Sequence, residues 1–433
     1  MKRVWLLSLS FACLSMSAHA ADLLAVYQQA KLSSPWLKLR AQQRDAQTAA
    51  AHAARGAVLP QLNLTGSAYA QRVSNISYES STVQATLSQD VFNLSDWGQW
   101  RAADKTALSQ NATYRYQEQT FVVNVLQDYF NVLLAQDNVT FSKANVAFLR
   151  QTLFQTRHEV EVGLKTITDL KQAEANYDQA IAELIKDEND KQVAIQALRV
   201  YTGKLYTQLA PLKKGFPFVA PKPANIHYWV NHAVLYNAQL QAERYTSLSS
   251  RENVVTQYGN HLPQVSLVAT YTRNDNNLKT ADVGLVGFNH QDDITGAVQL
   301  TWNILQGGTL FAQQTQASKQ YTSQLNTQEN TYRTTVSTTR QDYLAVMSEL
   351  SQVKSYQRAV VAGEASLKQF EAKYRVGIET IVNVLDELQK LYQAKQNLAQ
   401  AQYAYIMNII KLKRDAGTLT EHDVKALNSW LGA

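Results

Sequence analysis

The sequence predicts a mainly α-helical protein with a membrane β-barrel. A trimeric α-barrel of long antiparallel coiled-coil helices continues into a twelve-stranded barrel, with four strands from each protomer. Three observations lead to this fold class. One order of motifs occurs twice along the 433 residues. Each copy contains one pair of alternating segments of strand length. The remainder is typical of helices of two lengths, one about twice the other.

The N-terminal residues have the features of a secretory signal peptide. A basic start and an apolar middle lead to the small residues Ala18 and Ala20, and we expect cleavage after Ala20, so that residues 1–20 are removed. Cys13, the only cysteine, lies inside this segment. A lipoprotein would begin at Cys13, but the preceding Ser-Phe-Ala is a poor lipidation site. The mature chain then has no cysteine, and packing alone must hold it.

The mature chain is built from two repeats of about 200 residues. The triplet Leu-Pro-Gln occurs in VLPQLNL and again in HLPQVSL, and other pairs of segments match in the same order along the chain. These pairs are AKLSSPWL with AVLYNAQL, LSQDVFN with LTWNILQ, QDYFNVL with QDYLAVM, and VGLKTITDL with VGIETIVNV. Chance similarity between Ala/Gln-rich helices does not explain an ordered series. We expect repeat 1 at 21–202, a linker at 203–224, repeat 2 at 225–416, and a C-terminal segment at 417–433 near the equatorial region.

Each repeat contains one strand hairpin, at about 61–92 in repeat 1 and about 264–304 in repeat 2. Apolar and small polar residues alternate with period two in 82–91 and in 294–304. Each alternating stretch is about ten residues, close to the ~9–11 residues of a tilted strand that crosses a bilayer. A soluble sandwich has the same alternation, but here the polar faces are small and nearly uncharged. Aromatic residues near the strand ends fit an interfacial girdle: Tyr69, Tyr78, Tyr271 and Trp302.

Two hairpins cannot close a membrane barrel, because they supply only four strands and lipid tolerates no open strand edge. Three protomers together would supply twelve strands, an even number within the usual range. Pro60 and Pro263 mark the helix-to-strand border of the two repeats. Proline removes a helical donor and biases the residue before it toward extended geometry.

The rest of each repeat is typical of helix. The long helices at 95–161 and 309–374 would each measure about 100 Å. Half-length helices of about 50 Å are expected at 22–57, 168–201, 225–258 and 380–414. Two half-length helices stacked end to end match one long helix. Residues 121–133 carry two adjacent apolar stripes, which indicate helical neighbours on both sides, as in a ring of helices.

The composition excludes several classes of function. Mean hydropathy is −0.30, and after the N-terminus no apolar run approaches the ~18–20 residues of a spanning helix. The net charge of +6 is spread along the chain, and no basic cluster with interleaved aromatics predicts nucleic-acid binding. The histidines lack metal-ligand spacing, and the sequence has neither a phosphate loop nor a nucleophile elbow. We therefore expect no enzymatic activity, no cofactor and no metal site.

The chain resembles the TolC family of trimeric outer-membrane efflux and secretion channels. The segments that carry the resemblance follow one another in family order: LSQDVFNLSDW, LQDYFNVLLAQD, RHEVEVGLKTITDLKQAEANYDQA, YRVGIETIVNVLDELQKLYQAKQNLAQAQYAYI and AGTLTEHDVKALN. The resemblance implies a homotrimer with a barrel in the outer-membrane lipid of a Gram-negative bacterium and a helical tunnel in the periplasm. It implies a passive exit channel of a tripartite efflux pump, a type I secretion system or both, gated at its periplasmic end. The implied partners are a periplasmic adaptor (membrane fusion) protein and an inner-membrane transporter of the RND, ABC or MFS type.

The resemblance also implies rings of carboxylates at the narrow periplasmic mouth. Two positions spaced i, i+3 after the second Val-Gly turn share a helix face, so that threefold symmetry makes rings. This sequence has Asn383 and Asp386 there. One ring is therefore neutral, and we expect a cation-selective mouth that is weaker than a double acidic ring. On this basis Asp386→Asn should abolish the cation preference.

Family members close the mouth by contacts between a tyrosine, an arginine and an aspartate. Tyr374 and Asp169 match two of these positions, but Glu379 occupies the position of the arginine. Lys165 lies at the position of repeat 1 that corresponds to Glu379. A Lys165–Glu379 contact that replaces part of the latch is one interpretation; two unrelated surface charges are the other.

Two turns at the helical end are the expected docking surface for an adaptor. Each carries Val-Gly followed by an apolar residue, and a glycine there suits a left-handed helix end. Exposed apolar tips often mark contact sites, although a glycine alone is also ordinary in a turn. The docking residues implied are Gly163, Leu164, Thr166, Gly377, Ile378 and Thr380.

A trimeric coiled-coil surface adhesin or stalk without transport activity is the alternative function. It predicts sustained heptads with a single apolar stripe and no paired hairpins. The two stripes and the stacked half-length helices argue against it.

Overall fold

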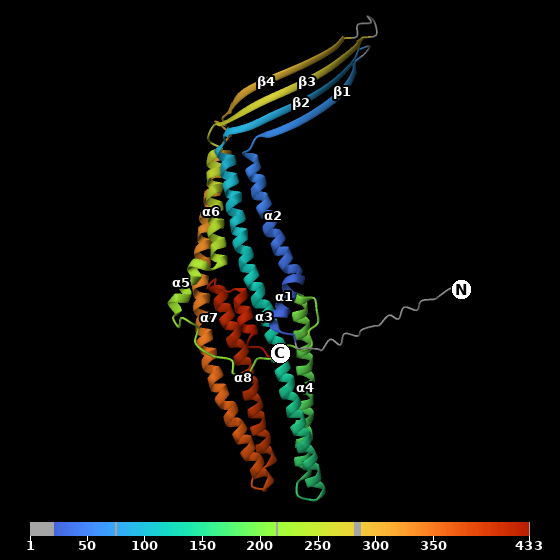
Figure 1. Ribbon diagram of the computed structural model, residues 1–433, viewed down its shortest axis with the longest axis vertical. Coiled ribbons are helices and arrows are strands. Elements are labelled where there is room, and N and C mark those ends of the chain that lie inside the picture. The colour runs from blue at the N-terminus through green and yellow to red at the C-terminus, as the bar shows by residue number, and fades with distance from the viewer. Residues whose placement is uncertain (1–20, 74–75, 214, 281–286, 433) are drawn as a thin grey trace, which may run out of the picture.

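The protein was analysed as a computed structural model, which describes residues 21–73, 76–213, 215–280 and 287–432. The signal peptide predicted at 1–20 lies outside the described residues. Figure 1 shows an elongated protomer with a sheet at one end and helices along the rest of its length. The helices are α1 (Leu23–Ser33), α2 (Pro35–Ala57), α3 (Leu94–Glu161), α4 (Ile167–Thr202), α5 (Ile226–Tyr236), α6 (Ala238–Gly259), α7 (Thr309–Arg375), α8 (Ile381–Asp415) and α9 (Glu421–Asn428). The strands are β1 (Gln61–Val73), β2 (Ile76–Phe92), β3 (Gln264–Thr280) and β4 (Gly287–Thr301).

The two predicted hairpins form one antiparallel sheet in the order β1-β2-β3-β4. The strands have 13, 17, 17 and 15 residues, longer than the expected ten. They are longer because pairing continues beyond the alternating segments into polar sequence. Toward that end of the sheet Ser80 pairs with Asn276 and Thr82 with Asn274, and each hydroxyl donates to the amide oxygen opposite at 2.7 Å. The hairpin tips at 74–75 and 281–286 lie outside the described residues.

The long and half-length helices have the predicted proportions. α3 has 68 residues and α7 has 67, whereas α4 has 36 and α8 has 35. The upper half-length helices, expected as single helices at 22–57 and 225–258, are each broken once. Ser34 caps α2 by accepting from the Leu37 N–H, and Asn237 caps α6 by accepting from the Leu240 N–H. Extended backbone at these two residues (ψ 117° and 120°) ends one helix before the next begins.

The half-length helices stack end to end, as predicted. The last carbonyl of α4, on Thr202, accepts from the Ser33 hydroxyl at 2.8 Å at the end of α1. The last carbonyl of α8, on Asp415, accepts from the Asn237 side-chain amide at 2.9 Å. These bonds satisfy carbonyl groups that a helix end leaves without an internal partner. In Figure 1, α2 accordingly continues the line of α4, and α6 that of α8.

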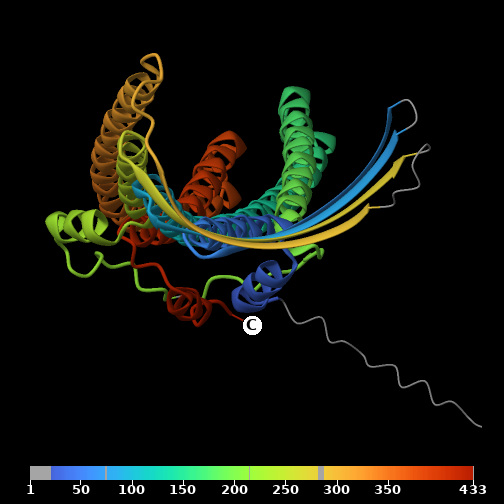
Figure 2. The ribbon, with the colours of Figure 1, turned by 90° about the horizontal axis from the view of Figure 1, so that it is seen from above.

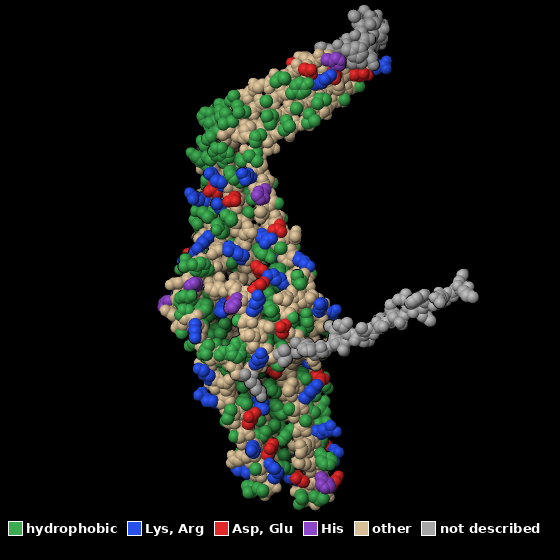
Figure 3. All heavy atoms as spheres, in the orientation of Figure 1, with side chains coloured by type: hydrophobic (Ala, Val, Ile, Leu, Met, Phe, Trp, Pro, Cys, Tyr) green, Lys and Arg blue, Asp and Glu red, His purple; other side chains and the backbone are tan. Residues whose placement is uncertain are grey.

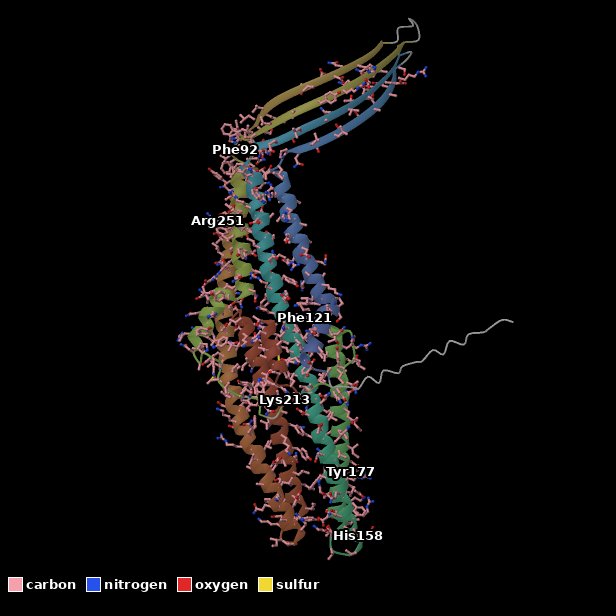
Figure 4. All side chains as sticks on the ribbon, in the orientation of Figure 1. Phe92, Phe121, His158, Tyr177, Lys213 and Arg251 are labelled. Carbon is pink, nitrogen blue, oxygen red and sulfur yellow. The ribbon has the colours of Figure 1, made fainter. Side chains whose placement is uncertain are left out.

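The core lies at mid-height, around the centre of α3. Both predicted stripes of α3 are buried, and Phe121, labelled in Figure 4, is at the centre of this region. Tyr129 is fully buried and its hydroxyl donates to the Ala210 carbonyl at 2.9 Å. α1, α9 and the linker between the repeats close over this core, and the Leu24 N–H donates to the Asn428 side chain at 3.0 Å. Burial of one such large side chain contributes about 1.5–3 kcal/mol to stability. The mid-height region is therefore the most strongly packed part of the protomer.

The protomer is a curved wall and not a closed bundle. Seen along its length in Figure 2, the sheet arches and the helices follow the same curve. Among the described residues, none of the helices combines the length and the apolar character needed to cross a membrane.

Candidate functional site at the helical turns

The α3–α4 and α7–α8 turns have the same backbone geometry. Gly163 and Gly377 adopt φ of 74° and 76°, the left-handed conformation expected from the sequence. In each turn the N–H of the next residue reaches back into the helix: Leu164 donates to Glu159 at 2.7 Å and Ile378 to Lys373 at 3.0 Å. A β-carbon on either glycine would meet nothing within 4 Å. The backbone conformation, and not lack of space, therefore requires glycine here.

Each turn presents an apolar side chain to solvent. Leu164 is 74% exposed and Ile378 is 75% exposed. Figure 3 shows hydrophobic side chains at both tips of the lower end of the molecule. Two apolar tips of equal geometry at one end of a protomer are typical of a contact surface.

The threonines that begin the half-length helices have different acidic neighbours. Thr166 and Asp169 form a capping box in α4, in which the carboxylate accepts from the Thr166 N–H at 2.9 Å and hydroxyl at 2.8 Å. The hydrogen bond from the Thr166 N–H lowers the pKa of Asp169 most, followed by the bond from the Thr166 hydroxyl. The charge of nearby Lys165 also lowers it. At the corresponding place in α8, Thr380 caps the helix but the residue that matches Asp169 is Asn383.

Glu379 supplies the carboxylate that Asn383 lacks. It accepts hydrogen bonds from the Asn383 side-chain amide and from the Thr380 N–H, the latter at 3.1 Å. These two bonds, with the charge of Lys373, lower the pKa of Glu379. The second turn thus keeps a carboxylate beside the start of its helix, where the helix dipole favours negative charge. The carboxylate is on Asp169 in the first turn and on Glu379, which contacts the matching residue Asn383, in the second.

Tyr374 connects the two helical hairpins. Its hydroxyl donates to Glu159 Oε2 at 3.1 Å, across from the last turn of α7 to that of α3. Burial, then the Glu159 carboxylate and Asp169 raise the pKa of Tyr374 to about 12, so it remains a hydrogen-bond donor at neutral pH. Lys165 Nζ lies 5.1 Å from the centroid of the Tyr374 ring, a cation–π contact. Glu159 was not predicted from the sequence, although it lies in the last turn of α3 before Gly163, as Tyr374 lies in the last turn of α7 before Gly377.

The Lys165–Glu379 ion pair proposed from the sequence is not formed within the described part of one protomer. The reason is that each partner has another contact. Lys165 lies against the Tyr374 ring, while Glu379 accepts from the Asn383 side chain and from the N–H of Thr380, the residue that caps α8.

Asp386 is paired along its own helix. Its carboxylate lies 2.7 Å from Lys390 Nζ, which also contacts Glu387 at 2.9 Å. Hydrogen bonds to these two acids, first Asp386, raise the pKa of Lys390 to about 12. Asp386 borders a groove of about 710 Å³ between α8 and the α3–α4 hairpin, whose lining includes several amide side chains (Gln172, Asn176, Gln179, Gln389 and Gln393). The expected ring residue therefore has a positive neighbour that the sequence analysis did not consider.

Pro60 and Pro263 lie between helix and strand. Pro60 separates α2 from β1 and Pro263 separates α6 from β3. Large apolar side chains gather at this border, as Figure 3 shows, and Phe92 marks it in Figure 4. The Trp302 ring N–H donates to the His261 carbonyl at 3.0 Å, which ties the end of β4 to the start of β3.

The described residues contain no group of three or more His, Cys, Asp or Glu side chains placed to hold a metal ion.

Comparisons with known proteins agree with this geometry. A family model described as outer membrane efflux protein matches residues 26–204 and 229–418. The outer membrane protein TolC of Escherichia coli (strain K12) is 33% identical over 436 residues, covering 98% of this chain and 88% of that protein. The proteases secretion protein PrtF of Dickeya chrysanthemi is 25% identical, covering 96% and 92%.

Two solved structures have a similar fold. CusC has a TM-score of 0.79 at 16% identity and covers 93% of this chain and 95% of its own. The outer membrane protein VceC of Vibrio cholerae has a TM-score of 0.76 at 18% identity, covering 91% and 96%.

Proposed function

Because this chain belongs to the outer membrane efflux protein family, we propose that three copies of it assemble into one tube. The chain is an outer-membrane exit channel for efflux and type I secretion that extends into the periplasm, as its relatives TolC and the protease secretion proteins PrtF and AprF indicate. It is a passive conduit, so its function depends on a bore, a gate and a docking surface.

The open sheet is the observation that supports assembly into a trimer. Within the part of the chain that the structure describes, β1 and β4 each pair on one side only, and lipid tolerates no open strand edge. The side chains of these two strands that alternate outward are apolar and exposed in the protomer: Leu62, Leu64, Ile294, Val298 and Leu300. β1 of one protomer beside β4 of the next closes a twelve-stranded barrel whose apolar face meets lipid.

The gate lies at the opposite end of the tube. Its supports are the Tyr374–Glu159 hydrogen bond and the Lys165 contact with the Tyr374 ring, which together hold the α7–α8 hairpin against the α3–α4 hairpin. Asp169, through its capping box, holds the start of α4 next to them. Rupture of these contacts lets the α7–α8 hairpin move outward and widens the mouth.

The docking surface is formed by the two turns. Gly163, Leu164 and Thr166 in one turn repeat as Gly377, Ile378 and Thr380 in the other. Equal tips on both hairpins suit a partner that itself binds in repeated copies, as a periplasmic adaptor protein around a trimer would. The adaptor in turn connects the tube to an inner-membrane transporter of the RND, ABC or MFS type.

Conductance of the purified protein in a planar lipid bilayer tests the channel function. A channel gives discrete current steps that grow linearly with voltage. A stalk or adhesin gives none, and a trimer that inserts without conducting would contradict the proposal.

A further inference from the structure

A pair of carboxyl groups, one buried and one half-buried, lies where α8 ends beneath α6. Asp415, the last residue of α8, is 5% exposed, and it acts on the half-buried Asp342 carboxyl of α7. Arg414 Nε donates to Asp415 Oδ1 at 2.6 Å. The other oxygen of Asp415 and one oxygen of Asp342 are buried without a hydrogen-bond partner. None of these groups belongs to the gate, the mouth or the docking turns.

Asp415 also borders a polar pocket. Asp415 and Arg414 line a cavity of about 290 Å³ whose other walls are uncharged oxygen- and nitrogen-bearing side chains, among them Tyr116, Asn237, Gln239, Asn330, Thr334, Thr335 and Thr338. These residues come from α3, α6 and α7 and from the cap between α5 and α6. The unpartnered oxygen of Asp415 therefore lies at a site built from polar groups, and not in an apolar gap.

Among the described residues, Arg414 is the one cation in direct contact with either acid, and Lys411 acts on Asp342 only through its charge. The carboxylate that has no direct partner is costly in a poorly solvated position. Two carboxylates that face each other cannot both remain ionised at low cost. A proton removes the excess charge and turns one carboxyl into a donor to the other. We propose that Asp342 and Asp415 form a proton-binding site, in which one shared proton holds α7 against the junction of α8 and α6.

The surrounding charges agree with this assignment. Burial, then Asp415, raises the pKa of Asp342 to about 7, against the opposing charges of Arg414 and Lys411. All three of these charged groups are on α8. From α3, Tyr116 acts on Arg414, and α6 and its cap bring only the uncharged Asn237 and Gln239 to the cavity.

α5 also packs against α7, and it carries two histidines. Of these, His232 lies between the rings of Tyr228 and Tyr236 of its own helix and is tilted against both. The other, His227, is exposed, and the charged groups that act on Asp342 are those of α8.

The site lies at a joint of the tube. The Asp415 carbonyl accepts from Asn237, and a β-carbon on Gly417 would come within 2.3 Å of the Tyr236 carbonyl oxygen, so the end of α8 and the segment after it are in close contact with the α5–α6 junction. Because the pKa of Asp342 is raised from 3.8 to about 7, its stabilising contribution is present at acid pH and is lost as the pH rises toward 7. Above that pH two negative charges face each other, and we expect α7 to loosen from the joint.

The first repeat contains a built-in control. Asp128 occupies the position of QDYFNVL that corresponds to Asp342 in QDYLAVM. Burial raises the pKa of Asp128 as well, but the group it faces on α4 is Tyr201, not a second acid. A proton shared between two acids is therefore specific to the second repeat.

Infrared titration of the intact trimer in lipid tests the proposal. The C=O stretching band of a protonated carboxyl should disappear with a midpoint near pH 7, following the pKa of Asp342. Asp342→Asn should remove this band, and Asp415→Asn should move its midpoint to lower pH because the acidic neighbour is gone. Asp128→Asn should leave the neutral-pH titration unchanged. A titration unaffected by Asp342→Asn would overturn the proposal.

Hydrogen exchange tests the consequence for the joint. Corrected for intrinsic rates, exchange at 412–417 and 238–241 should rise between acid and alkaline pH in the wild type and in Asp128→Asn, but not in Asp342→Asn. Migration of the unheated trimer on a gel shows that each variant is assembled. If calcium chloride abolishes the infrared band at acid pH in the wild type, the site binds a metal ion in preference to a proton, and the assignment is wrong.

Discussion

At the scale of single residues, the two helical turns differ by the place of one carboxylate. Asp169 lies inside α4, whereas at the corresponding turn Glu379 lies just before α8 and contacts Asn383. A comparison of single positions predicts a neutral ring at Asn383. It leaves out contacts between residues four apart, which join Glu379 to Asn383 and Lys390 to Asp386.

The charge at the mouth is expected to depend on Glu379 and Lys390 in opposite directions. Glu379→Gln should lower the ratio of cation to anion permeability, and Lys390→Gln should raise it because it releases Asp386 from its partner. A unit charge acts on an ion 4 Å away in water with about 1 kcal/mol, so a ring of them should change the ratio several-fold. Reversal potentials in a salt gradient measure this ratio. A permeability ratio equal to that of the wild type in both variants would show that these residues do not face the bore.

The Tyr374–Glu159 hydrogen bond is expected to hold the mouth closed. Tyr374→Phe and Glu159→Leu should each increase the open probability in single-channel recordings, since each removes a bond of about 1 kcal/mol in every protomer. The double variant should add little to either single one. Tyr177→Phe, in α4 at the same end of the molecule (Figure 4), is the matched control and should behave as the wild type. Recordings in which all four variants coincide would rule out this latch.

At the scale of elements, helix lengths and stacking were predictable, but helix breaks were not. The 3.6-residue periodicity continues across Ser34 and Asn237, so that pattern alone favoured single helices at 22–57 and 225–258. Capping by these two side chains divides each into two. The signal was present in the matched segments AKLSSPWL and AVLYNAQL, where a capping residue directly precedes the second helix.

The paired turns are expected to act together in docking. Leu164→Asp and Ile378→Asp should each weaken co-purification with the adaptor, because a charge replaces an apolar contact, and the double variant should lose it. Leu32→Asp in α1, where the leucine is 73% exposed, is the control for an exposed charge away from the turns. All these variants should keep wild-type conductance. Full adaptor recovery with the double variant would place docking elsewhere on the tube.

At the scale of the whole molecule, the protomer is incomplete by itself. Its curved sheet ends in two edge strands, and its helices follow an arc around an open side (Figure 2). The strand count and the rule against open edges in lipid were enough to predict assembly from the sequence.

Cross-linking is expected to join β1 of one protomer to β4 of the next. The only natural cysteine is Cys13, so a cysteine at Ser67 can be combined in turn with cysteines at Thr295, Ala297 and Gln299. At least one pair should give covalent trimers on oxidation, since two intervening strands, each ~4.8 Å from the next, keep β1 and β4 of one protomer too far apart for a disulfide. Ser67 with Thr82, which face each other within the sheet, should give monomers only. Monomers from every pair would contradict the trimer.

The sequence by itself determined the two repeats, the four strands, the helix lengths and their stacking. These depend on periodicity and chain length, which are local properties that a repeat shows twice. Only the tertiary structure decided which charged side chains meet. Lys165 lies on Tyr374 and not beside Glu379, Glu159 accepts from Tyr374, and Asp342 faces Asp415. Side-chain contacts between helices depend on their rotation and relative height, and the spacing of residues along the chain does not specify either.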